Sequence, residues 1–423
     1  MKIVVFGLGY VGATATACLL RDGHTVIGID VSTDKAAMIE SGVSPVSEPG
    51  LDELLAAGRD AGRLSATTDI GRHLDDADIA MVCVGTPSLP SGGLDLTQVS
   101  AVSAELAAAL KTRDADREPL IIAYRSTMYP GAMEDIVLPA LIEAAGEAPG
   151  TRFEAVLNPE FLRESTAIQD YYAPSRVVVG EREPGVTRRM LGVYDHIDAP
   201  FFELPYRTAE MVKLSDNGFH ALKVVFANEI GRLALEFDVD PEPLIDVFLS
   251  DTKLNISPYY LRPGGAFGGS CLPKDVRAIS ALAGIRGVEL PVMSNVINSN
   301  EAHKRYLADR VMRHLEPGGS VLLIGLTFKA ETDDLRESPL IDLAEALVGK
   351  GYDLKIYDPD LKNRELVGAN LAYVQQRLPH LSRLLVEDVD AAGDVSLVVV
   401  GKGVDIDRDS LGKQGPVVDI DRL

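Results

Sequence analysis

Residues 3–12 read IVVFGLGYVG, and this stretch decides the fold of the sequence around it. An apolar strand leads into the spacing G-x-G-x-x-G, which is followed by a helix to about Arg21 and a second strand that ends at Asp30. In that context the glycines permit a tight turn and let a pyrophosphate approach the N–H groups of the helix N-terminus. Asp30 can accept hydrogen bonds from the adenosine ribose, and its charge would repel a 2′-phosphate. The stretch therefore predicts a dinucleotide site that favours NAD over NADP.

The α/β rhythm continues along the chain. Apolar runs typical of short or buried parallel strands lie at residues 64–68, 79–84, 120–124 and 153–157. Polar residues follow three of these runs directly: Gly85-Thr86-Pro87, Arg125-Ser126-Thr127, and residues 158–164, which read NPEFLRE. Ligands of such sheets lie outside the carboxyl ends of the strands, so these residues predict one site lining, although any single one could instead be a helix cap.

A long helix is predicted from residue 208 to about 237, with Thr208 as its N-cap. At ~1.5 Å per residue it would span ~45 Å, which suits a spine between two domains. Residues 216–218, DNG, are poor helix formers in mid-helix, which usually has a packing or functional reason. We expect a buried functional stripe, with a solvated polar face as the alternative. The stripe is formed by four polar residues close to one face: Lys213, Asn217, His220 and Asn228.

Residues 316–319, EPGG, predict a linker into a second α/β unit. No second G-x-G-x-x-G follows the first strand of that unit, so we expect a nucleotide-like ligand but not a second dinucleotide. Lys329 and Arg336 lie in the loop after this strand and supply the cations that an anionic ligand requires. The expected strands are residues 321–325, 354–358, 397–400 and 417–419, with a helix from 339 to about 351.

Residues 264–275 read GGAFGGSCLPKD. Four glycines allow close approach of the backbone to a ligand, beside a thiol whose pKa a neighbouring cation could lower. The alternative is a glycine-rich surface turn with an inert, buried Cys271. A reactive thiol in a chain with one dinucleotide site suggests two oxidations at one carbon. A thiolate can add to an aldehyde, the thiohemiacetal can lose a hydride, and water can hydrolyse the thioester.

Composition excludes several classes of protein. A net charge of −22 argues against nucleic-acid binding and means that an anionic ligand needs locally placed Lys and Arg. The acidity itself is most simply a solvated surface. Three cysteines imply no disulfide framework. No apolar run reaches the ~18 residues of a membrane span, and a strand stands where a signal peptide would, so we expect a soluble, cytoplasmic protein without membrane partners.

A chain of 423 residues suggests two or three domains. We predict an α/β fold in which an N-terminal Rossmann NAD-binding domain and a C-terminal Rossmann-like domain are joined by a long central helix. The expected boundaries are 1–203 for the first domain, 204–314 for a central helical domain with the cysteine loop, and 315–423 for the third domain.

Motifs from nearly the whole chain resemble those of the UDP-glucose/GDP-mannose dehydrogenase family. They are FGLGYVG at 6–12, EPGL at 48–51, VGTP at 84–87, RST at 125–127, NPEFLRE at 158–164, GGSCLPKD at 268–275, FK at 328–329 and TDDLRESP at 332–339. Fewer residues are similar to the members that act on GDP-mannose: YYLRPG at 259–264, Leu272, RESTAI at 163–168 and FANEI at 226–230. Three places depart from that pattern: Gly265, where those members carry Phe, Ser215-Asp216, and YPGA at 129–132.

The resemblance implies an NAD-dependent, four-electron oxidation of GDP-mannose at C6 to GDP-mannuronate, a precursor of uronate-containing polysaccharide such as alginate. It also implies a homodimer or higher homo-oligomer formed through the spine helix. The nearest alternative is the same chemistry on UDP-glucose or another nucleotide sugar. A single-step β-hydroxyacid dehydrogenase would have no use for Cys271, and a non-catalytic NAD sensor need not keep Cys271, Lys213, Asn217 and Asp275 together.

The resemblance also implies roles for individual residues, and no metal site. Cys271 would be the nucleophile, Lys213 and Asn217 would stabilise the oxyanion, and Glu160, Asp275 and Thr127 would handle protons and the hydrolytic water. The cofactor would contact Gly7, Gly9, Tyr10, Val11, Gly12, Asp30, Lys35, Thr86, Thr127, Glu164, Lys274 and Arg336. The nucleotide sugar would contact Glu160, Lys213, Asn217, His220, Asn228, Tyr259, Tyr260, Arg262, Gly268 and Lys329.

Overall fold

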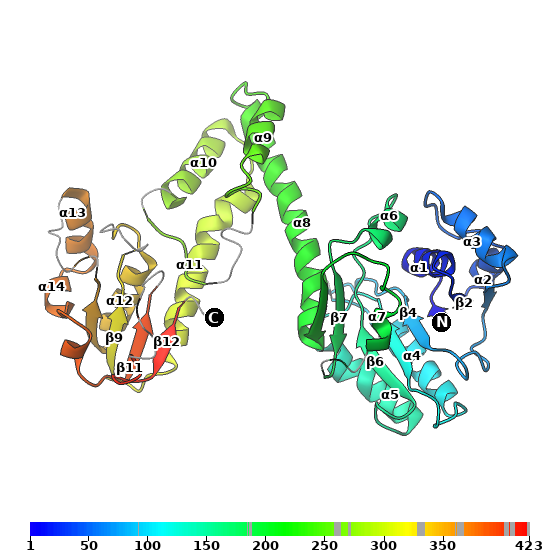
Figure 1. The fold of residues 1–423 in the computed structure, drawn as a ribbon. Coiled ribbons are helices and arrows are strands. Elements are labelled where there is room, and N and C mark those ends of the chain that lie inside the picture. Colours follow the sequence, from blue (N-terminus) through cyan, green and yellow to red (C-terminus); the bar gives the residue numbers. More distant parts are fainter. Residues whose placement is uncertain are drawn as a thin grey trace. The chain divides into compact units, whose positions relative to one another are not determined.

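A computed structural model of the chain gives two compact units, Met1–Ala221 and Leu222–Leu423, and each is described by itself. Figure 1 shows the path of the chain through both. The structure describes residues 1–91, 93–183, 185, 188–257, 264–269, 272–327, 335–359, 361, 368–401, 406 and 411–420.

The first unit is built on an eight-stranded sheet with the order β3-β2-β1-β4-β5-β6-β7-β8. All neighbouring strands are parallel except β6 and β7. The doubly wound sheet is therefore confirmed, and the loops after β1, β4, β5 and β6 meet at one edge. The strands are β1 (Lys2–Phe6), β2 (Thr25–Ile29), β3 (Leu64–Thr67), β4 (Ile79–Val82), β5 (Leu120–Tyr124), β6 (Phe153–Leu157), β7 (Val177–Glu181) and β8 (Phe201–Pro205).

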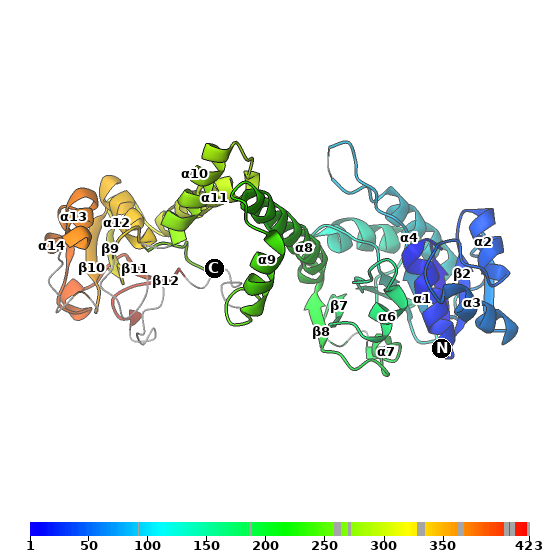
Figure 2. The same ribbon diagram turned by 90° about the horizontal axis from the view of Figure 1, so that it is seen from above.

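Helices cover both faces of this sheet, because strand residues alternate between two apolar cores. Val4 and Phe6 of β1 face the core that includes α4 (Thr97–Leu110) and α5 (Leu138–Ala145). Ile3 and Val5 face the core that includes α1 (Tyr10–Arg21) and α3 (Leu51–Asp60), and Figure 2 shows these helices from above. The unit also contains α2 (Thr33–Glu40), the short π-helix Met133–Val137, α6 (Ala167–Tyr172) and α7 (Arg188–Leu191).

The long helix is α8 (Tyr206–Leu235), a single run of 30 residues (Figure 1). It begins directly after β8, so Thr208 lies inside the first turn and the prediction of an N-cap there is wrong. Tyr206 fixes this earlier start, because it is 3% exposed and its hydroxyl donates to the Ala155 carbonyl at 2.5 Å. Glu210, 1% exposed, accepts from the amides of Gly131 and Met133 at 2.6 and 2.8 Å. The start of α8 is thus anchored to the first unit.

The second unit contains a four-stranded parallel sheet with the order β10-β9-β11-β12. Its strands are β9 (Ser320–Ile324), β10 (Asp353–Tyr357), β11 (Leu397–Val400) and β12 (Val417–Asp419). Its helices are α9 (Pro241–Ser250), α10 (Leu272–Arg286), α11 (Pro291–Met312), α12 (Pro339–Gly349), α13 (Gly368–Arg377), α14 (Leu381–Leu384) and the 3₁₀ turn Asp390–Ala392. Over the residues described, none of the helices combines the length and apolar character needed to cross a membrane.

Candidate active site

The glycine turn between β1 and α1 has the geometry of a dinucleotide site. Gly7 has φ +86°, and a Cβ there would lie 3.1 Å from the Cys83 carbonyl carbon. A Cβ on Gly12 would lie 1.8 Å from the Gly7 carbonyl oxygen, so this position must be glycine. Among the residues that the structure describes, none but its chain neighbours comes within 4 Å of a Cβ placed on Gly9, which is the N-cap residue of α1. The amides at the start of α1, where Tyr10 and Val11 lie, are therefore accessible to an anionic group.

Asp30 lies at the end of β2 and is 8% exposed. Its Oδ2 accepts from the Leu8 amide at 2.7 Å and its Oδ1 from the Ser32 amide at 2.8 Å. Lys35 Nζ approaches Oδ2 at 4.0 Å. Each carboxylate oxygen retains capacity for a further hydrogen bond. Asp30 thus holds the glycine turn in shape as well as offering acceptors to a ribose, a structural role that the sequence analysis missed.

Two further contacts arrange the carboxyl edge of the sheet. Thr86, after β4, donates from Oγ1 to the Thr127 carbonyl after β5 at 2.9 Å, so two predicted cofactor residues lie together. Tyr10 donates to Glu48 Oε2 at 2.5 Å, and burial together with this carboxylate raises the pKa of Tyr10 above its usual value.

Glu48 is a site residue that the sequence analysis quoted in a motif but gave no role. It is 8% exposed and accepts from the amides of Ser165 and Ala167, both at 2.8 Å. Ser165 has φ +70°, an uncommon conformation for a residue other than glycine. The carboxylate therefore ties the loop that carries the exposed Glu164 to the start of α1.

Lys213 and Glu160 form the most buried ion pair among the predicted catalytic residues. Lys213 Nζ lies 3.0 Å from Glu160 Oε1, and the side chains are 11% and 13% exposed. Glu160 Oε2 accepts from the Leu162 amide at 2.6 Å. The carboxylate is fixed from two sides, at the carboxyl end of β6.

A cleft of about 910 Å³ adjoins this pair, and we call it the lysine cleft. Of the predicted stripe on α8, only Lys213 is buried, whereas Asn217 and His220 are exposed. Asn228 lies further along α8, in the second unit. The cleft is lined by residues of the 161–176 segment and by Lys213, Asp216, Asn217 and His220.

Arg176 and Asp216 also line the lysine cleft and form an ion pair with each other. The negative charge of Asp216 is thereby balanced by Arg176. The Arg176 guanidinium also lies 4.5 Å from the ring centre of Phe161, a geometry typical of a cation–π contact. Sequence reasoning could not pair Arg176 with Asp216, because 40 residues separate them.

In the second unit, the described part of the glycine-rich loop, residues 264–269, is held by α11. Asn300 Oδ1 accepts from the Phe267 amide at 3.0 Å, and its Nδ2 donates to the Phe267 carbonyl at 2.8 Å. His303 Nε2 lies 2.7 Å from the Gly264 carbonyl oxygen. A Cβ on Gly268 would lie 2.3 Å from the Glu337 carbonyl oxygen, so this glycine lets the loop pack on the turn before α12. Asn300 and His303 are supporting residues that the sequence analysis missed.

Lys274 and Asp275 lie in the first turn of α10, next to each other. Lys274 Nζ is 3.4 Å from Asp275 Oδ1, and both side chains are 67% exposed. Arg336, partly buried, lies in the turn before α12. Five predicted residues lie outside the described residues: Cys271, Tyr259, Tyr260, Arg262 and Lys329.

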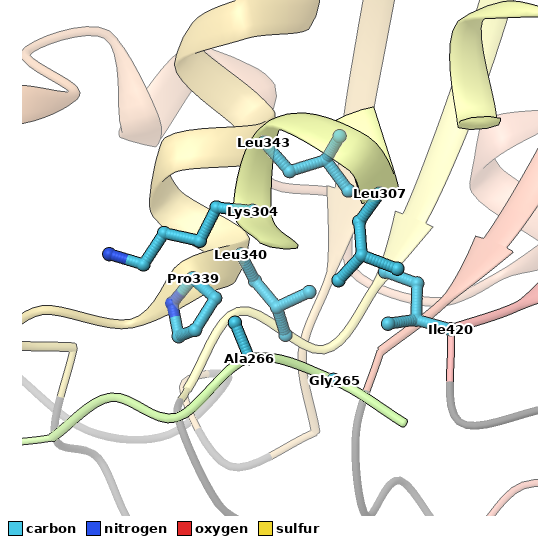
Figure 3. A pocket seen from close by; sticks show the side chains of 8 residues that line it. All are labelled: Gly265, Ala266, Lys304, Leu307, Pro339, Leu340, Leu343 and Ile420. Atoms are coloured by element: carbon cyan, nitrogen blue, oxygen red, sulfur yellow. The ribbon is translucent and has the colours of Figure 1, made fainter. Parts of the chain in front are cut away.

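A separate pocket of about 410 Å³ lies in the second unit, where Gly265 and Ala266 face α11 and α12 (Figure 3). Its wall is mainly apolar, with Leu307, Leu340 and Ile420 directed toward it. The amine of Lys304 is held by Glu301 at 2.7 Å and by Asp342 at 2.8 Å. Gly265 contributes no side chain, so this wall stays open at the position where the sequence departs from the GDP-mannose pattern.

Models of one protein family match along most of the chain. The NAD binding domain of the UDP-glucose/GDP-mannose dehydrogenase family matches residues 1–198, its central domain matches residues 207–302, and its UDP binding domain matches residues 322–399.

Individual relatives agree with these matches. The chain is 44% identical to GDP-mannose 6-dehydrogenase of Pseudomonas aeruginosa over 98% of this chain and 94% of that one. It is 32% identical to a UDP-glucose 6-dehydrogenase of Haloferax volcanii over 85% and 83% of the two chains. A crystal structure of a ternary complex of the Pseudomonas aeruginosa GDP-mannose dehydrogenase matches with a TM-score of 0.93 at 43% identity, covering 99% of this chain and 96% of that one. These findings confirm the predicted fold class.

Proposed function

The chain belongs to the UDP-glucose/GDP-mannose dehydrogenase family, and from this membership we propose that it oxidises C6 of GDP-mannose to a carboxylate with NAD as the electron acceptor. The relatives that match at the higher identity are named for GDP-mannose, whereas the archaeal relative named for UDP-glucose matches at the lower identity. The proposed product is GDP-mannuronate, a precursor of uronate-containing polysaccharide.

The Lys213–Glu160 pair carries this proposal. A buried cation and a partly buried carboxylate, 3.0 Å apart, border a cleft at the same sheet edge as the glycine turn. Charge that develops on a substrate oxygen in this cleft would be stabilised by Lys213 and by Asn217 one turn along α8. Glu160 would accept the proton that the substrate releases.

The residues of the first unit fit the cofactor. NAD supplies a hydride acceptor when it is bound. The uncapped start of α1 would hold the pyrophosphate, and Asp30 would accept from the adenosine ribose. Lys35, Thr86 and Thr127 would line the same sheet edge.

Cys271 would supply the covalent step. Its thiolate adds to the aldehyde carbon, the resulting thiohemiacetal loses a hydride, and water hydrolyses the thioester to the carboxylate and free thiol. Asp275 and Thr127 would position that water. The complete reaction converts one CH₂OH group, two NAD⁺ and one water into a carboxylate, two NADH and three protons. Asn300 and His303 would fix the backbone that leads to Cys271.

Residues of the second unit would bind the nucleotide sugar. These are Asn228, Tyr259, Tyr260, Arg262, Gly268 and Lys329, while Lys274 and Arg336 would contact the cofactor. A homodimer is inferred from exposed apolar side chains of the central region, where Val224, Leu235 and Val247 are 60%, 62% and 72% exposed. We also infer a cytoplasmic location, because the substrate and cofactor are cytoplasmic metabolites.

Initial rates of NADH formation with GDP-mannose and with UDP-glucose test the substrate. A kcat/KM at least about tenfold higher for GDP-mannose is expected, because a site built for one base and sugar leaves polar groups unpaired with another. A preference for UDP-glucose would overturn the base and sugar assignment but not the reaction type. Cys271→Ser is expected to stop turnover at the second oxidation, and wild-type steady-state rates in that variant would contradict the covalent role.

A further inference from the structure

A second cavity in the first unit adjoins the lysine cleft, and we call it the arginine cavity. It has a volume of about 360 Å³, is partly open to solvent, and is lined by Arg125, Glu160, Tyr171 and Tyr194, among others. Lys213 lines the lysine cleft and its partner Glu160 lines the arginine cavity, so their ion pair stands between the two spaces. Both spaces are lined by Phe161, Leu162, Asp170, Pro174 and Arg176.

Two buried polar groups at this cavity have no hydrogen-bond partner among the residues that the structure describes. Arg125 is 6% exposed, and its Nη1 donates to Asn158 Oδ1 and to the Tyr194 hydroxyl, both at 2.7 Å. These partners are neutral, and within the described part of the chain the buried Arg125 Nε has no hydrogen-bond partner. Tyr171 is 5% exposed, and its hydroxyl is likewise buried and unpartnered.

A small polar molecule in the cavity could form hydrogen bonds with Arg125 Nε and the Tyr171 hydroxyl. A buried donor without a partner destabilises the folded state, because it has lost its hydrogen bonds to water and gained none. A polar cavity meets this need with ordered water, each molecule of which makes about three hydrogen bonds. Arg125, Tyr171 and Glu160 all line the arginine cavity, so a water that satisfies Arg125 Nε or the Tyr171 hydroxyl would lie at the wall of the cavity that Glu160 also lines.

We propose that the arginine cavity is a water site that carries protons from Glu160 to solvent through the Tyr171 hydroxyl. The proposal rests on the proton-accepting role proposed for Glu160. The arginine cavity is lined by Glu160. Once Glu160 has accepted a proton from the substrate, it must release that proton before it can accept another.

The proton balance shows why such a route is needed. Each nucleotide sugar oxidised releases three protons. When Glu160 has taken a proton from the substrate, its O–H bond must break as a new O–H bond forms on a neighbouring water. That water passes a proton to the Tyr171 hydroxyl oxygen while the phenolic proton leaves to the next water, so Tyr171 ends the transfer neutral.

Tyr171 relays without ionising. Burial raises the pKa of Tyr171 well above its usual value, so the phenolate is not populated at neutral pH. The hydroxyl instead accepts one hydrogen bond and donates another. Tyr171 is therefore a positioning residue for water.

Tyr171→Phe tests this route, because it removes the hydroxyl and keeps the ring. We expect kcat with GDP-mannose to fall about tenfold, less than the 10²–10⁴ of a direct acid–base group. The solvent deuterium isotope effect on kcat should rise, while the KM values for NAD and GDP-mannose stay unchanged. Wild-type kcat and isotope effect in Tyr171→Phe would overturn the proposal.

Tyr172→Phe is the matched control. The Tyr172 hydroxyl donates to the Cys18 carbonyl at 3.1 Å and to Asp22 Oδ1 at 2.9 Å, and this residue lines neither space. Its loss should lower thermal stability and leave the isotope effect unchanged. Equal changes in both variants would show that the Tyr171 hydroxyl acts only in stability, which also overturns the relay.

A high-resolution crystal structure of the wild-type protein tests the water site independently of turnover. Ordered water bonded to Arg125 Nε and the Tyr171 hydroxyl is the expected result, and a dry or collapsed cavity would overturn it. If wild-type protein forms no NADH from either nucleotide sugar, the proposed function fails. The crystallographic result then still decides the water site, so the two failures are distinguishable.

Discussion

The two α/β units contain turns that share one construction and differ in what they can bind. Gly7 and Gly325 follow the first strand of each sheet with φ +86° and +85°. The Gly7 amide donates to the Ile29 carbonyl and the Gly325 amide to the Tyr357 carbonyl, both at 2.8 Å. At the next position in each turn, the Leu8 amide donates to Asp30 Oδ2 at 2.7 Å and the Leu326 amide donates to Asp358 Oδ2 at 2.6 Å.

The turns diverge after the leucine. Gly9 stands at the uncapped start of α1, whereas Thr327 occupies the equivalent position in the second unit. There α12 begins only at Pro339, and the Ser338 hydroxyl caps it by accepting from the Leu340 amide at 3.3 Å.

The comparison separates scaffold from binding site. A first glycine and a buried acid after the second strand build the turn in both units, so they do not by themselves indicate a dinucleotide. The further glycines and the free amides of α1 make room for a pyrophosphate. In the second unit the segment between β9 and α12 is longer, and the sequence carries Lys329 and Arg336 there, where we propose the nucleotide-sugar site.

The largest expected difference between the units concerns their thiols. Burial raises the pKa of Cys18 and of Cys83 to about 12, so at pH 8 roughly one molecule in 10⁴ carries either thiolate. Iodoacetamide should alkylate one thiol per native chain, Cys271, and abolish NADH formation, with all three labelled after unfolding. Mass spectrometry of peptides reads out the sites. Full activity in protein alkylated at Cys271 would remove its covalent role.

Gly12→Ala should have the next largest effect. The added Cβ would lie 1.8 Å from the Gly7 carbonyl oxygen, so the turn must move. A displacement of this size costs about 10²-fold in kcat/KM for NAD. Gly284→Ala on α10 is the control, since, its neighbours in the chain and in its own helix aside, its Cβ would lie more than 4 Å from every other residue in the described ranges. Normal NAD kinetics in a folded Gly12→Ala variant would contradict the geometry of the turn.

Asp30→Ala and Asp358→Ala compare the shared scaffold directly. Asp30→Ala leaves the amides of Leu8 and Ser32 without a carboxylate, and Asp358→Ala leaves those of Leu326, Thr327 and Leu361 without one. Each change should therefore lower the free energy of unfolding by about 1–3 kcal/mol. Only Asp30→Ala should raise the KM for NAD, by about tenfold, and weaken discrimination against NADP. Denaturant unfolding and cofactor titrations give both quantities. An equal effect of both variants on NAD would mean that the turn held by Asp358 supports the NAD site as much as the turn held by Asp30, and would contradict the distinction between the two turns.

Ser338→Ala should have the smallest effect. It removes the cap of α12 and a 2.7 Å hydrogen bond to the Leu326 carbonyl, at a cost of about 1 kcal/mol. The midpoint of thermal unfolding should fall by a few degrees, with the KM for NAD unchanged. A large change in that KM would be inconsistent with a purely local cap.

The sequence predicts the sheet where apolar strands alternate with helices, but it does not indicate the far edge. β7 and β8 were missed. β8 has exposed and partly buried residues and ends at Pro205, so it lacks the continuous apolar run of a central strand. β7 pairs antiparallel with β6, whereas the alternation of strands and helices in the sequence predicts parallel strands.

Site residues could be predicted from the sequence only where they lie within one short motif. The glycine spacing and the polar run after β6 indicate Gly12 and Glu160 directly. The partners that shape the site are distant in sequence: Tyr194 lies 69 residues from Arg125, and Ser165 lies 117 residues from Glu48. Such pairs arise from the order of the strands and leave no periodic signal in the chain.

The most direct test of the proposed four-electron oxidation is the amount of NADH formed per GDP-mannose, with the nucleotide sugar limiting and the reaction run to completion. The chain contains no tryptophan, so NADH fluorescence is read over a low protein background. Two NADH per GDP-mannose are expected if Cys271 carries the aldehyde on to the thioester and carboxylate. One NADH per GDP-mannose would mean that oxidation stops at the aldehyde and would contradict the account.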